Sequence, residues 1–213
     1  MHPQACRLFI VVFLSIMPGL VFSETMSDAN LSPIEQEVFA ELNLVRSDPK
    51  GYAEYLDEWR QYFRGNQLQR PDKTTLITNE GAAAFDEAIA FLRATDPMPI
   101  LRLSKGLSLA ARAHVSDQND GTIGHEGRDG SQPWERMNRY GTWHDQVAEN
   151  ISYGGYTARG VVIQLIVDDG VPDRGHRINM FAPEYRFVGV GCGSHARFGD
   201  MCVMDYAAQY TEK

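Results

Sequence analysis

The first half of the chain carries apolar residues at helical spacing. Ser32 precedes a proline and stands three residues before Glu35, which is a signature of a helix start, and the Asp48-Pro49 step ends the helix that follows. A second helix is expected from Pro49, with aromatic and aliphatic residues on one side. Three further segments are predicted as a polar connection over 64–78 and as helices over about 80–94 and 104–120.

From Gly121 to Tyr156 the sequence changes to glycine-rich loops. They are expected to be interrupted by one short helix over 133–140 and a brief strand around 147–152. Thr157 can cap another helix, after which a loop is expected over 168–175.

The chain ends in two strand-like segments, 186–192 and 201–207, which predict an antiparallel hairpin through the connection 193–200. This pairing would place Cys192 opposite or nearly opposite Cys202, at a separation that a disulfide can close. Because helices come first and strands are concentrated late, the pattern indicates a single α+β domain.

Residues 1–23 have the pattern of a signal peptide. Arg7 is followed by an apolar run too short to span a bilayer comfortably, and cleavage is expected after Ser23. An uncleaved membrane anchor is the alternative. The protein is therefore expected to be secreted or periplasmic and to meet a membrane only during export. A flexible segment would cover 24–32 and the folded domain 33–210.

The charge balance narrows the choice of partners. The chain has 28 acidic and 20 basic side chains, and the predicted signal peptide contains only one of these, Arg7, so the mature chain has 19 basic side chains and a net charge of −9. Nucleic acids and anionic membranes are bound by positively charged surfaces, which excludes them as general partners. Export also leaves an even pair of cysteines, Cys192 and Cys202, in an oxidising compartment, where a disulfide is expected.

Several familiar chemistries have no support in the sequence. The glycines at 189 and 191 precede a second strand, whereas a dinucleotide-binding motif needs a helix there. His125-Glu126 lacks the second histidine of a zinc-protease helix, and there is no Gly-x-Ser-x-Gly nucleophile motif.

Three short phrases bounded by turn-forming residues carry the candidate chemistry. His125 lies in Gly-His-Glu-Gly, Glu149 in Ala-Glu-Asn and His176 in Arg-Gly-His-Arg. Imidazole and carboxylate groups bind divalent metals such as zinc, and a site with two or three protein ligands keeps positions open for water. A single loop histidine, however, is more often a surface or hydrogen-bonding residue.

An ordered set of motifs resembles the CAP superfamily, the cysteine-rich secretory, antigen 5 and pathogenesis-related 1 type proteins, also known as SCP domains. The resemblance covers about residues 36–208 and is greatest to the bacterial-like branch, because the additional disulfides of the animal venom branch are absent. The motifs are Leu42-Asn-Leu-Val-Arg-Ser-Asp-Pro49, Leu109-Ala-Arg-Ala-His-Val-Ser-Asp117, Gly124-His125, Ala148-Glu-Asn-Ile151, Arg174-Gly-His-Arg177 and Val188-Gly-Val-Gly191.

This resemblance implies a three-layer α-β-α sandwich with a central cleft lined by two histidines and two acidic residues. His125, Glu149 and His176 match three of the four positions. At the fourth, where many relatives have a glutamate, this chain offers Asp169 or Asp168.

The remaining histidines are expected to have other roles. His114 is predicted to be a packing residue on the apolar side of its helix, His195 to be exposed in the hairpin loop, and His144 is a weaker candidate for the cleft. Asn150 and Arg177 are expected to fix the backbone of their own loops.

Three functions are compatible with these residues. The first is a secreted binding domain whose cleft holds Zn²⁺ or another divalent cation and recognises a further extracellular ligand, a lipid, peptide or glycan. The second is a metal-dependent, protease-like hydrolase in which Glu149 acts as general base on a water held by His125 and His176. The third is a non-catalytic structural or interaction module in which the same residues hold the loops together.

Overall fold

The computed structural model describes residues 30–213, so the predicted signal peptide and residues 24–29 lie outside the described part. Ser32 and Glu35 form the expected capping box at the start of the first described helix. Leu31 already belongs to the hydrophobic core. The elements in chain order are α2 (Pro33–Ser47), α3 (Pro49–Arg60), β1 (Phe63–Arg64), β2 (Gln67–Leu68), β3 (Leu76–Ile77), α4 (Ala82–Ala94), β4 (Arg102–Leu103), α5 (Lys105–Asp117), α6 (Pro133–Tyr140), β5 (Gly141–Tyr153), α7 (Ala158–Val167), α8 (Gly175–Phe181), β6 (Phe187–His195) and β7 (Gly199–Glu212).

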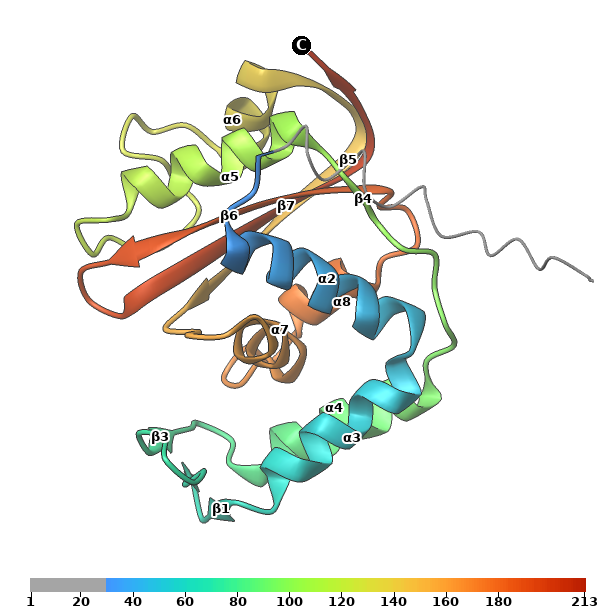
Figure 1. Cartoon of the computed structure of the whole chain (residues 1–213), viewed down its shortest axis with the longest axis vertical. Coiled ribbons are helices and arrows are strands. Elements are labelled where there is room, and N and C mark those ends of the chain that lie inside the picture. The colour runs from blue at the N-terminus through green and yellow to red at the C-terminus, as the bar shows by residue number, and fades with distance from the viewer. Residues whose placement is uncertain (1–29) are drawn as a thin grey trace, which may run out of the picture.

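A four-stranded sheet with the order β4-β6-β7-β5 forms the middle layer. β6 and β7 form the predicted C-terminal hairpin, β5 pairs antiparallel with β7, and β4 pairs parallel with β6. Alternate residues of β7 point to opposite faces, because side chains alternate along a strand. Met204 and Tyr206 pack into the core formed with α2, α7 and α8, whereas Val203 and Ala207 pack against α5. The fold is therefore α+β, with helices on both faces of the sheet (Figure 1).

Glycine allows α5 to approach the sheet closely. A Cβ atom on Gly189 of β6 would lie 2.1 Å from the backbone of Leu107 and Ser108, and one on Gly191 would meet the backbone of Arg112 at 2.5 Å. Only a residue without a side chain fits this contact, so the glycines of the Gly-x-Gly phrase serve helix packing.

The predicted disulfide is confirmed. Cys192 and Cys202 are directly opposite in the β6–β7 ladder, with their Cα atoms 4.1 Å apart and their sulfur atoms bonded. The link lies near the turn of the hairpin, where the Ala196 N–H donates to the Asn119 carbonyl at 3.1 Å.

The structure differs from the sequence-based expectation in several elements, among them the short strand β4. The strand expected around 147–152 extends over Gly141–Tyr153, with a bulge between His144 and Val147. The segment 64–78 is not only a connection, since it contains the small sheet β1-β2-β3 at the far end of the α3–α4 pair (Figure 1). The short helix α8 was not expected, because seven residues give too little periodicity to recognise.

Across residues 30–213, no helix combines the length and apolar character needed to cross a membrane.

Candidate functional site

Glu149 is the buried centre of the candidate site. Its Oε1 accepts a hydrogen bond from Nδ1 of His125 at 2.8 Å, and its Oε2 accepts one from the guanidinium of Arg136 at 2.7 Å. The Glu149 side chain is 1% exposed and the Arg136 side chain 0% exposed. Burial alone would raise the pKa of Glu149, but the His125 hydrogen bond and the Arg136 charge hold the pKa below its ordinary value. Glu149 is therefore an ionised, fully engaged carboxylate.

A second carboxyl group lies beside Glu149. Asp205 of β7 is its register partner across the β5–β7 ladder and is completely buried. Burial and the neighbouring charge of Glu149 raise the pKa of Asp205 well above its ordinary value, so Asp205 is the protonated member of the pair. The sequence pointed to neither Asp205 nor Arg136, because the register of β5 against β7 and the position of α6 are tertiary properties.

The loop that carries His125 is anchored through the preceding residue. The carbonyl oxygen of Gly124 accepts hydrogen bonds from Nε2 of His114 at 2.9 Å and from the side-chain amide of Gln118, and its N–H donates to the Tyr153 hydroxyl at 3.0 Å. Gly124 has a φ of +110°, which favours glycine. His114 is fully buried, as expected for a packing residue, and burial lowers its pKa, so it is neutral in this contact.

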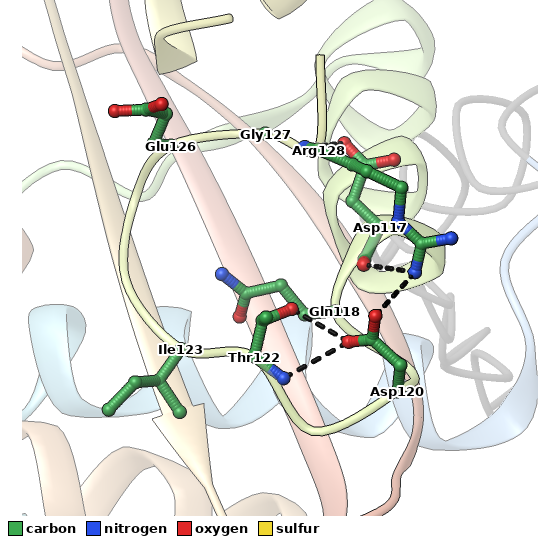
Figure 2. Close-up of a pocket in the computed structure, with 8 residues that line it drawn as sticks. All are labelled: Asp117, Gln118, Asp120, Thr122, Ile123, Glu126, Gly127 and Arg128. Atoms are coloured by element: carbon green, nitrogen blue, oxygen red, sulfur yellow. Dashed lines mark hydrogen bonds and ion pairs between the residues drawn. The ribbon is translucent and has the colours of Figure 1, made fainter. Parts of the chain in front are cut away.

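The same loop encloses a small hollow of about 180 Å³ (Figure 2). Its polar groups largely satisfy one another: Asp120 accepts from the Thr122 hydroxyl and from Arg128, and Arg128 also donates to the Asp117 carbonyl. The hollow is part of the loop architecture that supports His125. Its lining residues are Asp117, Gln118, Asp120, Thr122, Ile123, Glu126, Gly127 and Arg128.

His176 has its own buried carboxylate. Nδ1 of His176 lies 2.6 Å from Oδ1 of Asp168, and the His176 N–H donates to Oδ2 of the same carboxylate at 2.9 Å. Asp168 ends α7 in a left-handed conformation, with a φ of 55°, which aims its side chain back at the start of α8.

Asp169 does not contact His176. Its carboxylate accepts hydrogen bonds from the backbone N–H groups of Asn79 and Glu80, at 2.7 and 2.8 Å. Of the two candidates, the structure thus places Asp168 at the histidine and Asp169 on the segment before α4. Arg174 also contacts the region around α4, since it forms ion pairs with Glu80 and Glu87 that fix the loop between α7 and α8.

Both histidines lie against the same edge strand, β5. Glu149 holds the side chain of His125, and the next residue, Asn150, donates its side-chain amide to the carbonyl of His176 at 2.9 Å. Consecutive residues of a strand point to opposite faces, so Glu149 and Asn150 make these two contacts on opposite sides of β5, at the open edge of the sheet. Within residues 30–213, no group of three or more His, Cys, Asp or Glu side chains is arranged to hold a metal ion.

The roles expected for His195 and His144 can be compared with their positions in the structure. The expectation that His195 is exposed is wrong: it is 1% exposed, because its Nε2 reaches the Thr122 carbonyl at 2.9 Å and its ring stacks on Phe198. His144 lies at the β5 bulge and is exposed, opposite Gln209 rather than beside Glu149.

Comparison with known proteins gives a family. The sequence profile of the cysteine-rich secretory protein (CAP) family matches residues 87–206, which is more than half of the 213-residue chain. No curated protein matches the sequence at a significant level.

Two solved bacterial structures are similar to this chain. An extracellular protein containing an SCP domain, from Bacillus anthracis, aligns at 17% identity and a TM-score of 0.44, covering 60% of this chain and 39% of its own length. An outer surface protein from Borrelia burgdorferi aligns at 17% identity and a TM-score of 0.42, covering 55% of this chain and 80% of its own. The family profile runs from within α4 to within β7 and includes His125, Glu149 and His176, so this chain belongs to the CAP family, the cysteine-rich secretory protein family.

Proposed function

We propose that this protein is an exported binding domain in which His125 and His176 hold a divalent cation, Zn²⁺ foremost, beside the edge strand β5. The observation that carries the proposal is that both imidazole rings are oriented by the same kind of contact. Each has its Nδ1 held by a buried carboxylate, Glu149 for His125 and Asp168 for His176. This contact leaves Nε2 of both rings available, and metal-binding histidines are commonly oriented by a carboxylate in this way.

The donor set fits an open site. Glu149 and Asp168 orient the histidines, and their carboxylate oxygens are already used in hydrogen bonds. The described residues would therefore provide two imidazole ligands, and the remaining positions on the metal would be open to water or to a ligand group. The histidine side chains are 49% and 26% exposed, for His125 and His176 respectively, so a cation reaches them from solvent. A bound cation would supply a positive charge for attracting an anionic or polar ligand group.

Export and a further ligand belong to the same proposal. The apolar segment after Arg7, the family and the Cys192–Cys202 disulfide support a role outside the cytosol. The surface around the two histidines would recognise a lipid, peptide or glycan, whereas the acidic net charge does not favour nucleic acid.

The hydrolase alternative lacks a supporting contact. A general base must reach a water, but both oxygens of Glu149 are occupied by His125 and Arg136 and the side chain is 1% exposed. We therefore place binding ahead of catalysis.

Zinc titration by calorimetry tests the proposal. His125→Ala and His176→Ala should each abolish or strongly weaken binding, and Asp168→Asn should weaken it by about tenfold or more, because the ring loses its orienting partner. His144→Ala, at an exposed histidine of β5, is the matched control and should bind like the wild type. Undiminished zinc binding in both the His125 and the His176 variant would leave only the structural-module alternative.

A further inference from the structure

A hollow of about 500 Å³ lies where all four strands of the main sheet come together at one end, apart from the histidine site. None of its lining residues is a hydrogen-bonding partner of His125, Glu149 or His176. The lining residues are Arg102 of β4, Asp145 and Gln146 of β5, Glu184 and Arg186 from the segment before β6, Phe187 of β6, and Ala208 and Gln209 of β7.

A β-bulge opens this hollow. His144 pairs with Gln209 and Val147 with Ala207, so two residues of β5, Asp145 and Gln146, face only one residue of β7. Asp145 takes a φ of +67°, which leaves Gln146 outside the regular ladder. Bulges re-aim side chains in this way, and the space beside the strands becomes accessible.

Two arginines in the hollow have no acidic partner among residues 30–213. Arg102 and Arg186 are neighbours across the β4–β6 edge, since the Arg102 N–H donates to the Arg186 carbonyl at 2.8 Å. Within residues 30–213 no carboxylate lies within 4.0 Å of either guanidinium, although most of the other arginines described there form ion pairs. Both arginines line the same hollow, and a bound anion would supply the counter-charge that they lack among the described residues.

The rest of the lining selects the kind of anion. The Arg102 guanidinium lies over the Phe187 ring, 5.1 Å from its centre, and Ala208 adds a second apolar contact surface. Glu184 and Asp145 also line the hollow, and Asp145 is held by Gln209 at 2.6 Å. Two acidic groups in the lining would repel a dense polyanion, whereas a single carboxylate can pair with the arginines.

We propose that this hollow binds a carboxylate attached to a small apolar group, with Arg102 and Arg186 pairing the carboxylate and Phe187 contacting the apolar part. Two sources offer this chemistry, a small organic acid and the carboxyl end of a peptide. Arginine suits this role because its planar guanidinium matches a carboxylate with two parallel hydrogen bonds.

The test uses probes that differ only in the carboxylate. The purified protein is titrated with N-acetylphenylalanine and with N-acetylphenylalanine amide, followed by NMR of the arginine side-chain N–H signals. The acid should shift the signals of Arg102 and Arg186, and the amide should bind about tenfold or more weakly because it lacks the charge-assisted hydrogen bonds. The tripeptide Gly-Gly-Phe distinguishes the sources: tighter binding than the acid identifies a peptide end, and equal or weaker binding identifies a small acid. Inorganic phosphate should bind more weakly than either.

A matched variant guards against a general charge effect. The double variant Arg102→Gln, Arg186→Gln should lose about tenfold or more in affinity for the acid. Arg197→Gln should keep it, although Arg197 is likewise an exposed arginine, without an acidic partner among the described residues and placed over an aromatic ring, that of Phe198. Equal binding of acid and amide, absence of shifts at Arg102 and Arg186, equal losses in the double variant and the Arg197 variant, or phosphate binding as tight as the acid would each overturn the proposal.

Discussion

Asp205 lies directly opposite Glu149 in the β5–β7 ladder, so two carboxyl groups face each other in a site closed to solvent. One of the two carboxyl groups is ionised and the other holds a proton. Arg136 and His125 keep Glu149 ionised, while burial and the charge of Glu149 keep the proton on Asp205.

This division makes stability depend on pH through Asp205. Its pKa is raised in the folded state, so the folded protein holds a proton that the unfolded chain releases above about pH 4. The contribution of Asp205 is therefore fully present at low pH and is lost as the pH rises, by at most about 1.4 kcal/mol per pH unit. Asp205→Asn cannot release a proton, so its free energy of unfolding should rise relative to the wild type between pH 4 and pH 7. Urea denaturation of both proteins at several pH values measures this difference, and a constant difference would contradict the assignment of the proton.

The Arg136–Glu149 pair should be far more sensitive than a surface ion pair on the same helix. Arg136→Met leaves the buried Glu149 carboxylate without its cation and should lower the free energy of unfolding by about 3–5 kcal/mol. Arg139 pairs with Asp129, but these side chains are 44% and 56% exposed, so Arg139→Met should cost no more than about 1 kcal/mol. Equal losses in chemical denaturation would show that burial does not govern the pair.

Close packing of α5 on β6 predicts intolerance at Gly189. Gly189→Ala places a Cβ atom 2.1 Å from backbone atoms of Leu107 and Ser108, which cannot move aside like a flexible side chain, and should cost about 3 kcal/mol or more. Gly175→Ala is the control, because its Cβ atom would meet nothing closer than Asp173 at 3.7 Å, and it should change stability by no more than about 0.5 kcal/mol. Thermal unfolding of the two variants gives the comparison.

Loss of the disulfide should be measurable but not fatal to the fold. Cys192 and Cys202 are 10 residues apart, and a loop of this length predicts a loss of about 2–3 kcal/mol when the double variant Cys192→Ser, Cys202→Ser is compared with the oxidised protein. A thiol assay on the denatured, unreduced wild type should find neither of these two cysteines reactive. If the assay found both cysteines reactive, the Cys192–Cys202 disulfide would be contradicted.

Local signals in the sequence identified most helices and the terminal hairpin. The capping box of Ser32 and Glu35 and the Asp48-Pro49 step act within a few residues, and the same contacts are found in the structure. The cysteine pairing followed equally directly, because a hairpin brings its own strands together.

Only part of the candidate site could be predicted from the sequence. The sequence named His125, Glu149 and His176, but it left Asp169 and Asp168 as alternatives at the fourth position. The left-handed turn at Asp168 sends two consecutive carboxylates in different directions, one to His176 and the other to the segment before α4. Sequence spacing cannot tell which of two adjacent residues points into a site when the backbone turns sharply between them.

The sequence by itself therefore determined most of the helices, the hairpin, the disulfide and the residue types available for the site. The tertiary structure alone decided that Asp205 faces Glu149, that Arg136 of α6 reaches the same carboxylate, and that His195 is buried. The physical reason is that helix caps and turns depend on neighbours in the chain, whereas strand register, burial and the protonation state of a buried carboxyl depend on groups that only the completed fold brings together.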